Sequence, residues 1–313
     1  MQMKRRTFLM SVAIGAMAVA MSTPGALAAG KALTIMAGVG GLEFPFFVIM
    51  MDKFKAEAEA IGGLTLIVSD GQNSATKQTA DIEAAIVQKV DAIVFSPLDV
   101  NALVPAIEAA IAAGIPVVTV DRRVDGVEGI LGHIGADNVA GGEAQAKAIV
   151  AAFPNGATIF NLQGQPGASP AIDRNKGLHN ILDTMPDKYK IVFEQTANWK
   201  RDEALAVAEA GFAANGKPDV IVCANDDMAL GVVEAVKSAG YSGVNIYGFD
   251  ALPAALAAIR EGTLAGTVDQ LPGEQAAKAL QIATDFVRDG KKPAKSVELL
   301  TPIAITKDNV PPA

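Results

Sequence analysis

Short apolar runs rich in β-branched residues alternate along this chain with segments of helical periodicity, and this alternation most constrains its fold. The clearest run, Val117–Val120, follows Pro116 and stops at Asp121 and Arg122. Runs of this length are typical of parallel strands that are buried on both faces. Ligands in open α/β sheets bind outside the carboxyl ends of the strands. The pattern therefore predicts Asp121 and Arg122 at a binding crevice, with a solvated ion pair at the strand end as the alternative.

The first half of the chain repeats this scheme several times. The expected strands cover residues 33–37, 64–69, 91–95 and 116–120, with a crossing strand at 130–134. The first helix expected between them begins at Pro45, and two more cover residues 74–89 and 101–113. A strand–helix order of this kind predicts a parallel, doubly wound sheet.

The same scheme starts again near Asp137. Further strands are expected at 157–161, 189–193, 220–224 and 244–249, a long helix at 272–289, and a terminal strand or hinge segment at 297–300. The chain therefore predicts an α/β protein with two doubly wound parallel-sheet lobes whose strand ends face each other across a cleft.

The N-terminal residues 1–28 are predicted to be a signal peptide. Lys4, Arg5 and Arg6 precede a small-residue apolar run, and the segment ends in a small-residue cleavage pattern at Ala28. Cleavage after Ala28 and export to the periplasm are expected, with the general secretory and twin-arginine routes both open. Its removal takes away three cations and no acidic residue, so the formal charge falls from −8 to −11.

This acidic balance argues against a nucleic-acid partner, because a phosphate backbone attracts basic surfaces. Cys223 is the only cysteine, so the chain can form no internal disulfide and no zinc site built on cysteines. His133 and His179 are expected in different lobes, so they do not predict a metal site. Asp226 and Asp227 are expected to cap a helix rather than bind a metal.

Neither a nucleophile–base pair nor a nucleotide loop supports an enzyme. The glycines at 38–41 would need a third glycine at Glu43 to match a dinucleotide-binding loop. We therefore expect a non-enzymatic protein without a cofactor or metal.

Several segments, in their order and spacing, are similar to a known family. They are Pro45-Phe46-Phe47, Thr119-Val120-Asp121-Arg122, Asp137-Asn138-Val139 with Gly141-Gly142, Leu162-Gln163-Gly164, Ala224-Asn225-Asp226 with Met228-Ala229-Leu230-Gly231, Gly248-Phe249-Asp250 and Gln270-Leu271-Pro272. The chain resembles the type I periplasmic sugar-binding proteins of ABC transporters over about residues 31–307. Within that family it is most similar to the ribose-binding proteins and their pentose and polyol relatives.

The resemblance implies a ligand site shared by two lobes. Phe46 and Phe47 would stack on the ligand, and Asp121 and Arg122 would bind its hydroxyl groups from the first lobe. The second lobe and the hinge would supply the remaining contacts, from Arg174, Trp199, Asn225, Asp250 and Gln270.

One position departs from the family pattern. Ribose-binding proteins carry Asn directly before the Pro-Phe-Phe segment, where it bonds a sugar hydroxyl, whereas this chain has Phe44. A hydrogen-bonding side chain is lost and an aromatic wall is gained. This change argues against ribose itself and suits a related pentose, a polyol or a deoxy sugar.

The resemblance also implies the domain division. The N-terminal lobe would comprise residues 29–136 plus 271–299, and the C-terminal lobe residues 137–270 plus 300–313. A hinge of three segments would cross between the lobes near Ala136, Gln270 and Leu300.

The predicted side chains suit a neutral carbohydrate. Carboxylates accept hydrogen bonds from hydroxyls, guanidinium groups donate to them, and aromatic faces cover apolar C–H surfaces. The charges of Asp121 and Asp250 balance those of Arg122 and Arg174, so an anionic ligand would face two opposing carboxylates.

The leading hypothesis is therefore an exported solute-binding subunit of a carbohydrate ABC importer. It would be a monomer that binds a neutral monosaccharide or polyol by hinge closure and then meets the permease subunits. A sugar or autoinducer receptor for signalling or chemotaxis is the alternative, and the same pocket could serve it. A repressor core of the same fold is disfavoured, because the signal peptide occupies the place of a DNA-binding module.

Overall fold

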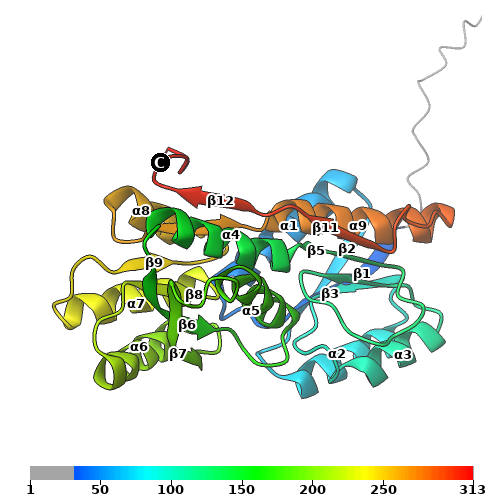
Figure 1. Cartoon of the computed structure of the whole chain (residues 1–313). Coiled ribbons are helices and arrows are strands. Elements are labelled where there is room, and N and C mark those ends of the chain that lie inside the picture. Colours follow the sequence, from blue (N-terminus) through cyan, green and yellow to red (C-terminus); the bar gives the residue numbers. More distant parts are fainter. Residues whose placement is uncertain (1–31, 313) are drawn as a thin grey trace, which may run out of the picture. The chain divides into compact units, whose positions relative to one another are not determined.

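The computed structural model describes residues 32–312 of the chain, and helices and strands alternate through most of them (Figure 1). The predicted signal peptide lies outside the described residues. No helix within residues 32–312 has the length and apolar character needed to cross a membrane.

Six parallel strands form the first sheet, in the order β11-β5-β4-β3-β1-β2. Their bounds are β1 Leu33–Val39, β2 Leu64–Asp70, β3 Ala92–Phe95, β4 Val117–Val120, β5 Gly132–Ala136 and β11 Val297–Leu300. The helices that pack on it are α1 Pro45–Ile61, α2 Ala75–Gln88, α3 Val104–Ala112 and α9 Pro272–Asp289. Helices α1 and α9 cover one face and α2 and α3 the other, and we call this unit the first lobe.

The second sheet has the order β12-β10-β9-β8-β6-β7. Its strands are β6 Ala157–Gln163, β7 Tyr189–Thr196, β8 Val220–Cys223, β9 Asn245–Tyr247, β10 Gly266–Asp269 and β12 Ile303–Thr306. Its helices are α4 Asn138–Ala152, α5 Ser169–Leu182, α6 Arg201–Asn215, α7 Asp226–Ser238 and α8 Pro253–Glu261. All its strand pairs are parallel except β10 with β12, and we call this unit the second lobe.

The predicted fold class, two doubly wound parallel-sheet lobes, is confirmed by this architecture. The crossing strand begins two residues later than expected, at Gly132. The sequence pattern did not predict β10, β12 or α8. Strand β10 has Val268 as its one large apolar residue. Strand β12 lies at the edge of its sheet with two of its four residues exposed, so it differs from the fully buried runs from which the other strands were predicted.

Burial explains why the short central strands form where they do. All four residues of β3, of β4 and of β8 are buried, as expected for parallel strands covered by helices on both faces. The first lobe buries Phe54 and Ile107 on opposite faces of its sheet. The buried central strands therefore fix where each strand ends and where the polar residues that follow it emerge.

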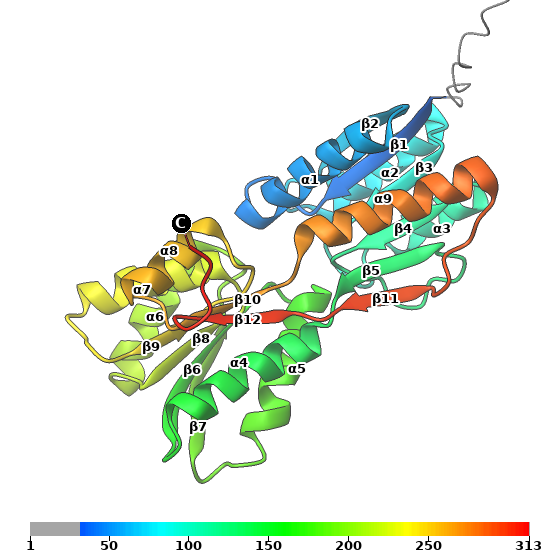
Figure 2. The ribbon, with the colours of Figure 1, turned by 90° about the horizontal axis from the view of Figure 1, so that it is seen from above.

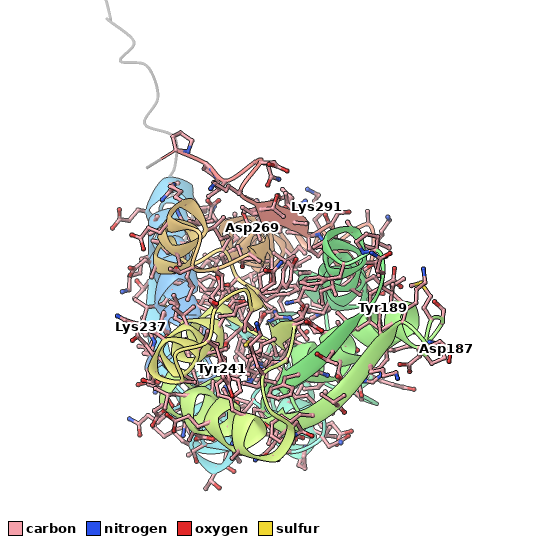
Figure 3. The ribbon with its side chains drawn as sticks, turned by 60° about the vertical axis from the view of Figure 1, so that its left-hand side comes forward. Asp187, Tyr189, Lys237, Tyr241, Asp269 and Lys291 are labelled. Carbon is pink, nitrogen blue, oxygen red and sulfur yellow. The ribbon has the colours of Figure 1, made fainter. Side chains whose placement is uncertain are left out.

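The periphery of the second lobe is held by aromatic side chains (Figure 3). The hydroxyl of Tyr189, at the start of β7, donates to the carbonyl oxygen of Phe153 over 2.9 Å. The ring of Tyr241, just after α7, meets the ring of Phe212 edge-on at 5.1 Å between centroids. The first contact ties the end of α4 to the outer strand β7, and the second packs the end of α7 against α6.

The chain passes between the two sheets three times (Figure 2). It leaves the first sheet after Ala136, returns to the first lobe after Asp269, and leaves again after Leu300. Backbone bonds lie at these crossings, for example from the amide of Asp137 to the carbonyl oxygen of Leu300 at 2.9 Å. The end of β5 and the end of β11 are thereby held side by side.

Glycines allow α4 and α5 to pack with their backbones in close approach. A Cβ at Gly177 would overlap the carbonyl oxygen of Val139, and one at Gly142 would overlap that of Arg174. Helix α5 carries Arg174, so this close approach also fixes the position of a predicted site residue.

We expect Gly177→Ala to destabilise the protein by about 1–3 kcal/mol, because the added methyl group forces two packed helices apart. Urea unfolding measures the change. Gly273→Ala is the matched control, since a Cβ there meets only the flexible side chain of Lys53. Equal stabilities of the two variants would contradict the close packing.

Candidate functional site

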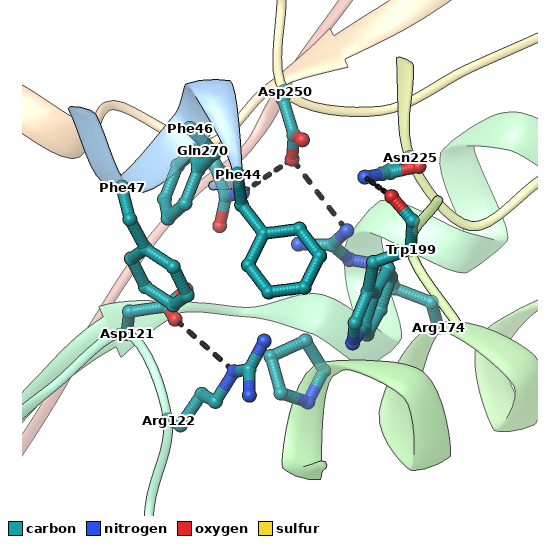
Figure 4. Close-up of a pocket in the computed structure, with 11 residues that line it drawn as sticks. Phe44, Phe46, Phe47, Asp121, Arg122, Arg174, Trp199, Asn225, Asp250 and Gln270 are labelled. Carbon is teal, nitrogen blue, oxygen red and sulfur yellow. Dashed lines mark hydrogen bonds and ion pairs between the residues drawn. The ribbon is translucent and has the colours of Figure 1, made fainter. Parts of the chain in front are cut away.

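A cavity lies where strand ends from both lobes meet (Figure 4). All ten residues predicted from the sequence line it, together with one residue that the sequence did not predict, Pro170 on α5. The lining residues are Phe44, Phe46, Phe47, Asp121, Arg122, Pro170, Arg174, Trp199, Asn225, Asp250 and Gln270.

Asp121 and Arg122 follow β4 and are 4% and 5% exposed, so they lie in an enclosed cavity rather than an open crevice. Ser96, which follows β3, donates its hydroxyl to Asp121 Oδ2 over 3.0 Å. Arg122 donates through Nη1 to the carbonyl oxygen of Leu98 at 3.2 Å, and its Nε lies 3.7 Å from Asp121 Oδ2. Both side chains are thus oriented by the ends of neighbouring parallel strands.

Three phenylalanines at the start of α1 form the aromatic wall of the first lobe. Pro45 opens the helix, and Phe44 is its N-cap residue in extended conformation. The Phe46 and Phe47 rings meet edge-on at 5.4 Å, and the Phe44 and Phe47 rings at 6.3 Å. Arg122 lies 5.1 Å from the Phe47 ring, so this wall also contacts a guanidinium group.

Arg174 is the main cationic group of the second lobe. Its Nε donates to Asn138 Oδ1 at 2.8 Å, and its Nη1 to the carbonyl oxygen of Ala224 at 2.7 Å. Its guanidinium carbon lies 3.6 Å from the centroid of the Phe249 ring. The side chain is therefore fixed before any ligand binds.

Asn138 was not among the predicted site residues, although it stands beside Asp137 where α4 begins. The cap of α4 is Asp137, whose carboxylate accepts the amide of Ala140. Asn138 instead orients Arg174, and no signal in the sequence distinguished these two roles.

Trp199 precedes α6 in a left-handed conformation, with φ of 68°. Its ring fills the space above Gly164, where a Cβ would overlap it. The Trp199 ring lies 5.5 Å from the guanidinium of Arg174 and 5.8 Å from that of Arg122. Trp199 therefore links cationic groups of both lobes.

Asp250 and Gln270 complete the cavity near the second crossing. Gln270 Nε2 donates to Asp250 Oδ1 at 2.6 Å, and Arg174 Nη1 lies 3.6 Å from the same oxygen. Asn225 is the N-cap of α7: its Oδ1 accepts the amide of Met228, and its Nδ2 donates to the carbonyl oxygen of Trp199. The predicted capping role of Asp226 and Asp227 is therefore wrong, since both lie in the first turn of that helix.

Three buried polar atoms that belong to cavity residues lack a hydrogen-bond partner within the described chain. They are Arg122 Nε, Trp199 Nε1 and Gln270 Oε1. Two of them donate and one accepts, and buried polar groups are costly to leave unpaired. A ligand that both donates and accepts would satisfy them.

Burial shifts the pKa values of the four charged groups of the cavity. Desolvation raises the pKa of Asp121, against the opposing effect of Arg122 and Arg174. It also raises the pKa of Asp250 to about 7, although Arg174 and Gln270 favour the charged form. Desolvation lowers the pKa of both arginines, and their aspartate partners oppose this shift. Each charge therefore depends mainly on its ion-pair partner in the same lobe, Arg122 for Asp121 and Arg174 for Asp250.

Comparison with known proteins agrees with this geometry. A model of the periplasmic binding protein domain matches residues 39–292. The ribose import binding protein of Bacillus subtilis is 39% identical over 271 residues, which cover 85% of each chain. A xylitol-binding protein of Mycolicibacterium smegmatis is 32% identical and covers 79% of this chain and 70% of that protein.

A solved structure shows the same fold at similar identity. The myo-inositol binding protein of Caulobacter, bound to myo-inositol, is 40% identical and superposes with a TM-score of 0.86 over 90% of this chain and 95% of that one. The fold, the cavity and these matches together define a class of two-lobed proteins that bind small solutes.

The chain belongs to the periplasmic binding protein family. Its members are substrate-binding proteins of transporters rather than enzymes, so the predicted resemblance and the prediction of a non-enzymatic protein are both confirmed.

The raised pKa of Asp250 predicts a pH dependence of stability. The folded, ligand-free protein keeps a proton on Asp250 that the unfolded chain releases, so the stabilisation is full below about pH 4 and is lost as pH rises through about 7. Asn carries no such proton. We therefore expect the difference in unfolding free energy, Asp250→Asn minus wild type, to increase by more than about 1 kcal/mol as the pH rises from about 4 to about 7.

Urea unfolding of ligand-free protein across that pH range measures this difference. Asp52→Asn, which removes an exposed carboxylate from α1, is the matched control. The raised pKa would be contradicted if the difference in unfolding free energy from the wild type changed with pH no more for Asp250→Asn than for Asp52→Asn.

Proposed function

We propose that this protein is the exported solute-binding subunit of a carbohydrate ABC importer and that the cavity binds one neutral monosaccharide or polyol. The observation that carries the proposal is the enclosed, charge-balanced cavity lined by Asp121, Arg122, Arg174 and Asp250. Two carboxylates and two guanidinium groups leave no net charge for an ionic ligand to neutralise. Hydroxyl groups can donate to the carboxylates and accept from the guanidinium groups at the same time.

The three unpartnered polar atoms and the aromatic walls narrow the ligand class. Arg122 Nε and Trp199 Nε1 need acceptors, and Gln270 Oε1 needs a donor, a combination that vicinal hydroxyls supply. Phe44 adds an apolar wall where ribose-binding proteins have Asn. We therefore favour a cyclic polyol of the myo-inositol kind, which the Caulobacter relative binds, over ribose, and a pentose-like sugar is the second candidate.

Contacts between the lobes support binding by hinge closure. The amide of Val100 donates to the carbonyl oxygen of Gly167 at 3.0 Å, and the amide of Arg123 donates to Ser169 Oγ at 3.0 Å. Arg123 also forms an ion pair with Asp173 on α5. These bonds join the rims of the two lobes on one side of the cavity, so an opening motion would break them.

The proposed lobes follow the predicted division, with residues 29–136 and 271–299 in one and 137–270 and 300–313 in the other. The three passages of the chain between the sheets would act as the hinge. A monomeric protein, released into the periplasm by cleavage after Ala28, would present both lobes to the permease subunits and would not bind nucleic acid.

We expect Arg174→Ala and Asp250→Ala to abolish binding, because each removes a charged partner from an enclosed site. Hydrogen bonds to charged groups contribute about 1.5–3 kcal/mol each, so losing two weakens binding by roughly 100-fold or more. Calorimetry with a panel of neutral pentoses, hexoses, deoxy sugars and cyclic and linear polyols tests this. Arg201→Ala, at an exposed arginine on α6, is the control, and near-normal affinity in either cavity variant would refute the site.

Closure itself is tested by small-angle scattering. The cavity is complete only when the lobes meet, so a ligand binds that arrangement better and shifts the hinge equilibrium toward it. We expect the radius of gyration to fall when the tightest ligand of the panel saturates the protein. A scattering curve that does not change at saturation would count against hinge closure.

A further inference from the structure

The turn that carries Asp250 has an unfavourable backbone conformation. It connects β9 to α8, and Asp250 and Ala251 have φ values of 118° and 54°. Residues with a Cβ rarely adopt positive φ, and such conformations persist only where surrounding structure holds them. The orientation of the Asp250 carboxylate therefore depends on what fixes this turn.

Asp226 holds the turn on both sides of Asp250. Its amide donates to the carbonyl oxygen of Phe249 at 2.7 Å, and its carboxylate Oδ2 accepts the amide of Leu252 at 2.8 Å. The side chain is fully buried and does not line the cavity. Asp226 thus forms hydrogen bonds with Phe249 and Leu252, on either side of Asp250, and does not line the cavity.

Thr267 on β10 extends this clamp to the residue in between. Its hydroxyl donates to Asp226 Oδ1 at 2.6 Å and accepts the amide of Ala251 at 3.2 Å. A Cβ at Gly248 would overlap the same carboxylate oxygen, so the strand end leaves room for this carboxylate alone. The amide of Asp250 itself donates to the carbonyl oxygen of Val268 at 2.8 Å. Each residue from 249 to 252 therefore has a backbone group that is held by a hydrogen bond.

We propose that Asp226 is a positioning residue for ligand binding, which acts together with Thr267 to hold the turn so that the Asp250 carboxylate points into the cavity. The inference rests on the proposed function of that cavity. Among residues 32–312, Asp226 is buried without a cationic partner in hydrogen-bond contact, and its carboxylate accepts from Leu252 in the turn and from Thr267 on the neighbouring strand. A residue that only stabilised α7 would bond within that helix.

Asp226→Asn is the direct test, because the amide keeps the shape of the side chain but cannot accept at both positions. We expect its affinity for myo-inositol, or for D-ribose if that binds better, to fall by about tenfold or more. Asp227→Asn is the matched control: it removes the neighbouring carboxylate, which pairs with Arg201 outside the cavity, and binding should stay near that of the wild type.

Rescue at Thr267 separates positioning from general stability. Thr267→Val removes the hydroxyl while keeping the shape, whereas Thr267→Ser keeps the hydroxyl and loses a methyl group. We expect Val to weaken binding several-fold and Ser to retain it, although both substitutions disturb the core. Equal affinities of the two variants would overturn the inference, and this comparison remains decisive if Asp226→Asn fails to fold.

Amide hydrogen exchange of the ligand-free protein makes the test independent of the ligand. The amides of Ala251 and Leu252 should exchange about tenfold faster in Asp226→Asn and Thr267→Val than in Asp227→Asn and Thr267→Ser. If the wild type binds neither probe, the proposed ligand class fails, and the exchange rates alone decide the role of Asp226. Unchanged exchange at both amides would refute it.

Discussion

The burial of two ion pairs, one from each lobe, in a single cavity is the interaction on which the site depends. A carboxylate or guanidinium group removed from water is costly unless partners surround it. Asp121 and Arg122 come from the first lobe, and Arg174 and Asp250 from the second, and each is at most 6% exposed. Each lobe pairs its own charges, Asp121 with Arg122 and Arg174 with Asp250, so both lobes bring a neutral ion pair to the cavity between them.

The remaining features of the site serve this requirement. Ser96 orients Asp121, Asn138 orients Arg174, and Gln270 donates to Asp250, so the charged groups are fixed by bonds within their own lobes or at the hinge. Such preorganisation lowers the entropic cost of binding. In the proposed function, a ligand would add its own contacts to those between the lobes, and it would therefore favour the closed arrangement.

Much of the site could be predicted because the sequence pattern indicates where the strands end. Runs such as Val117–Val120 show where strands stop, and parallel sheets place those stops on one edge. The resemblance to sugar-binding proteins then selected residues from the second lobe, and all of them line the cavity. Strands β10 and β12 and helix α8 were missed, because β10 has one large apolar residue, β12 is a half-exposed edge strand and α8 is only nine residues long.

The sequence by itself determined the periodicity of apolar residues, the repeated strand–helix order and the balance of charged residues among the predicted site residues. Each of these follows from residue types and their spacing along the chain. Only the tertiary structure decided that Asp226 braces the turn of Asp250 instead of capping a helix. Their roles differ because Asp226 meets Thr267, a residue 41 positions away, whereas Asp250 meets Arg174 and Gln270. Hydrogen bonds over such separations arise from the packing of whole elements, which no local pattern encodes.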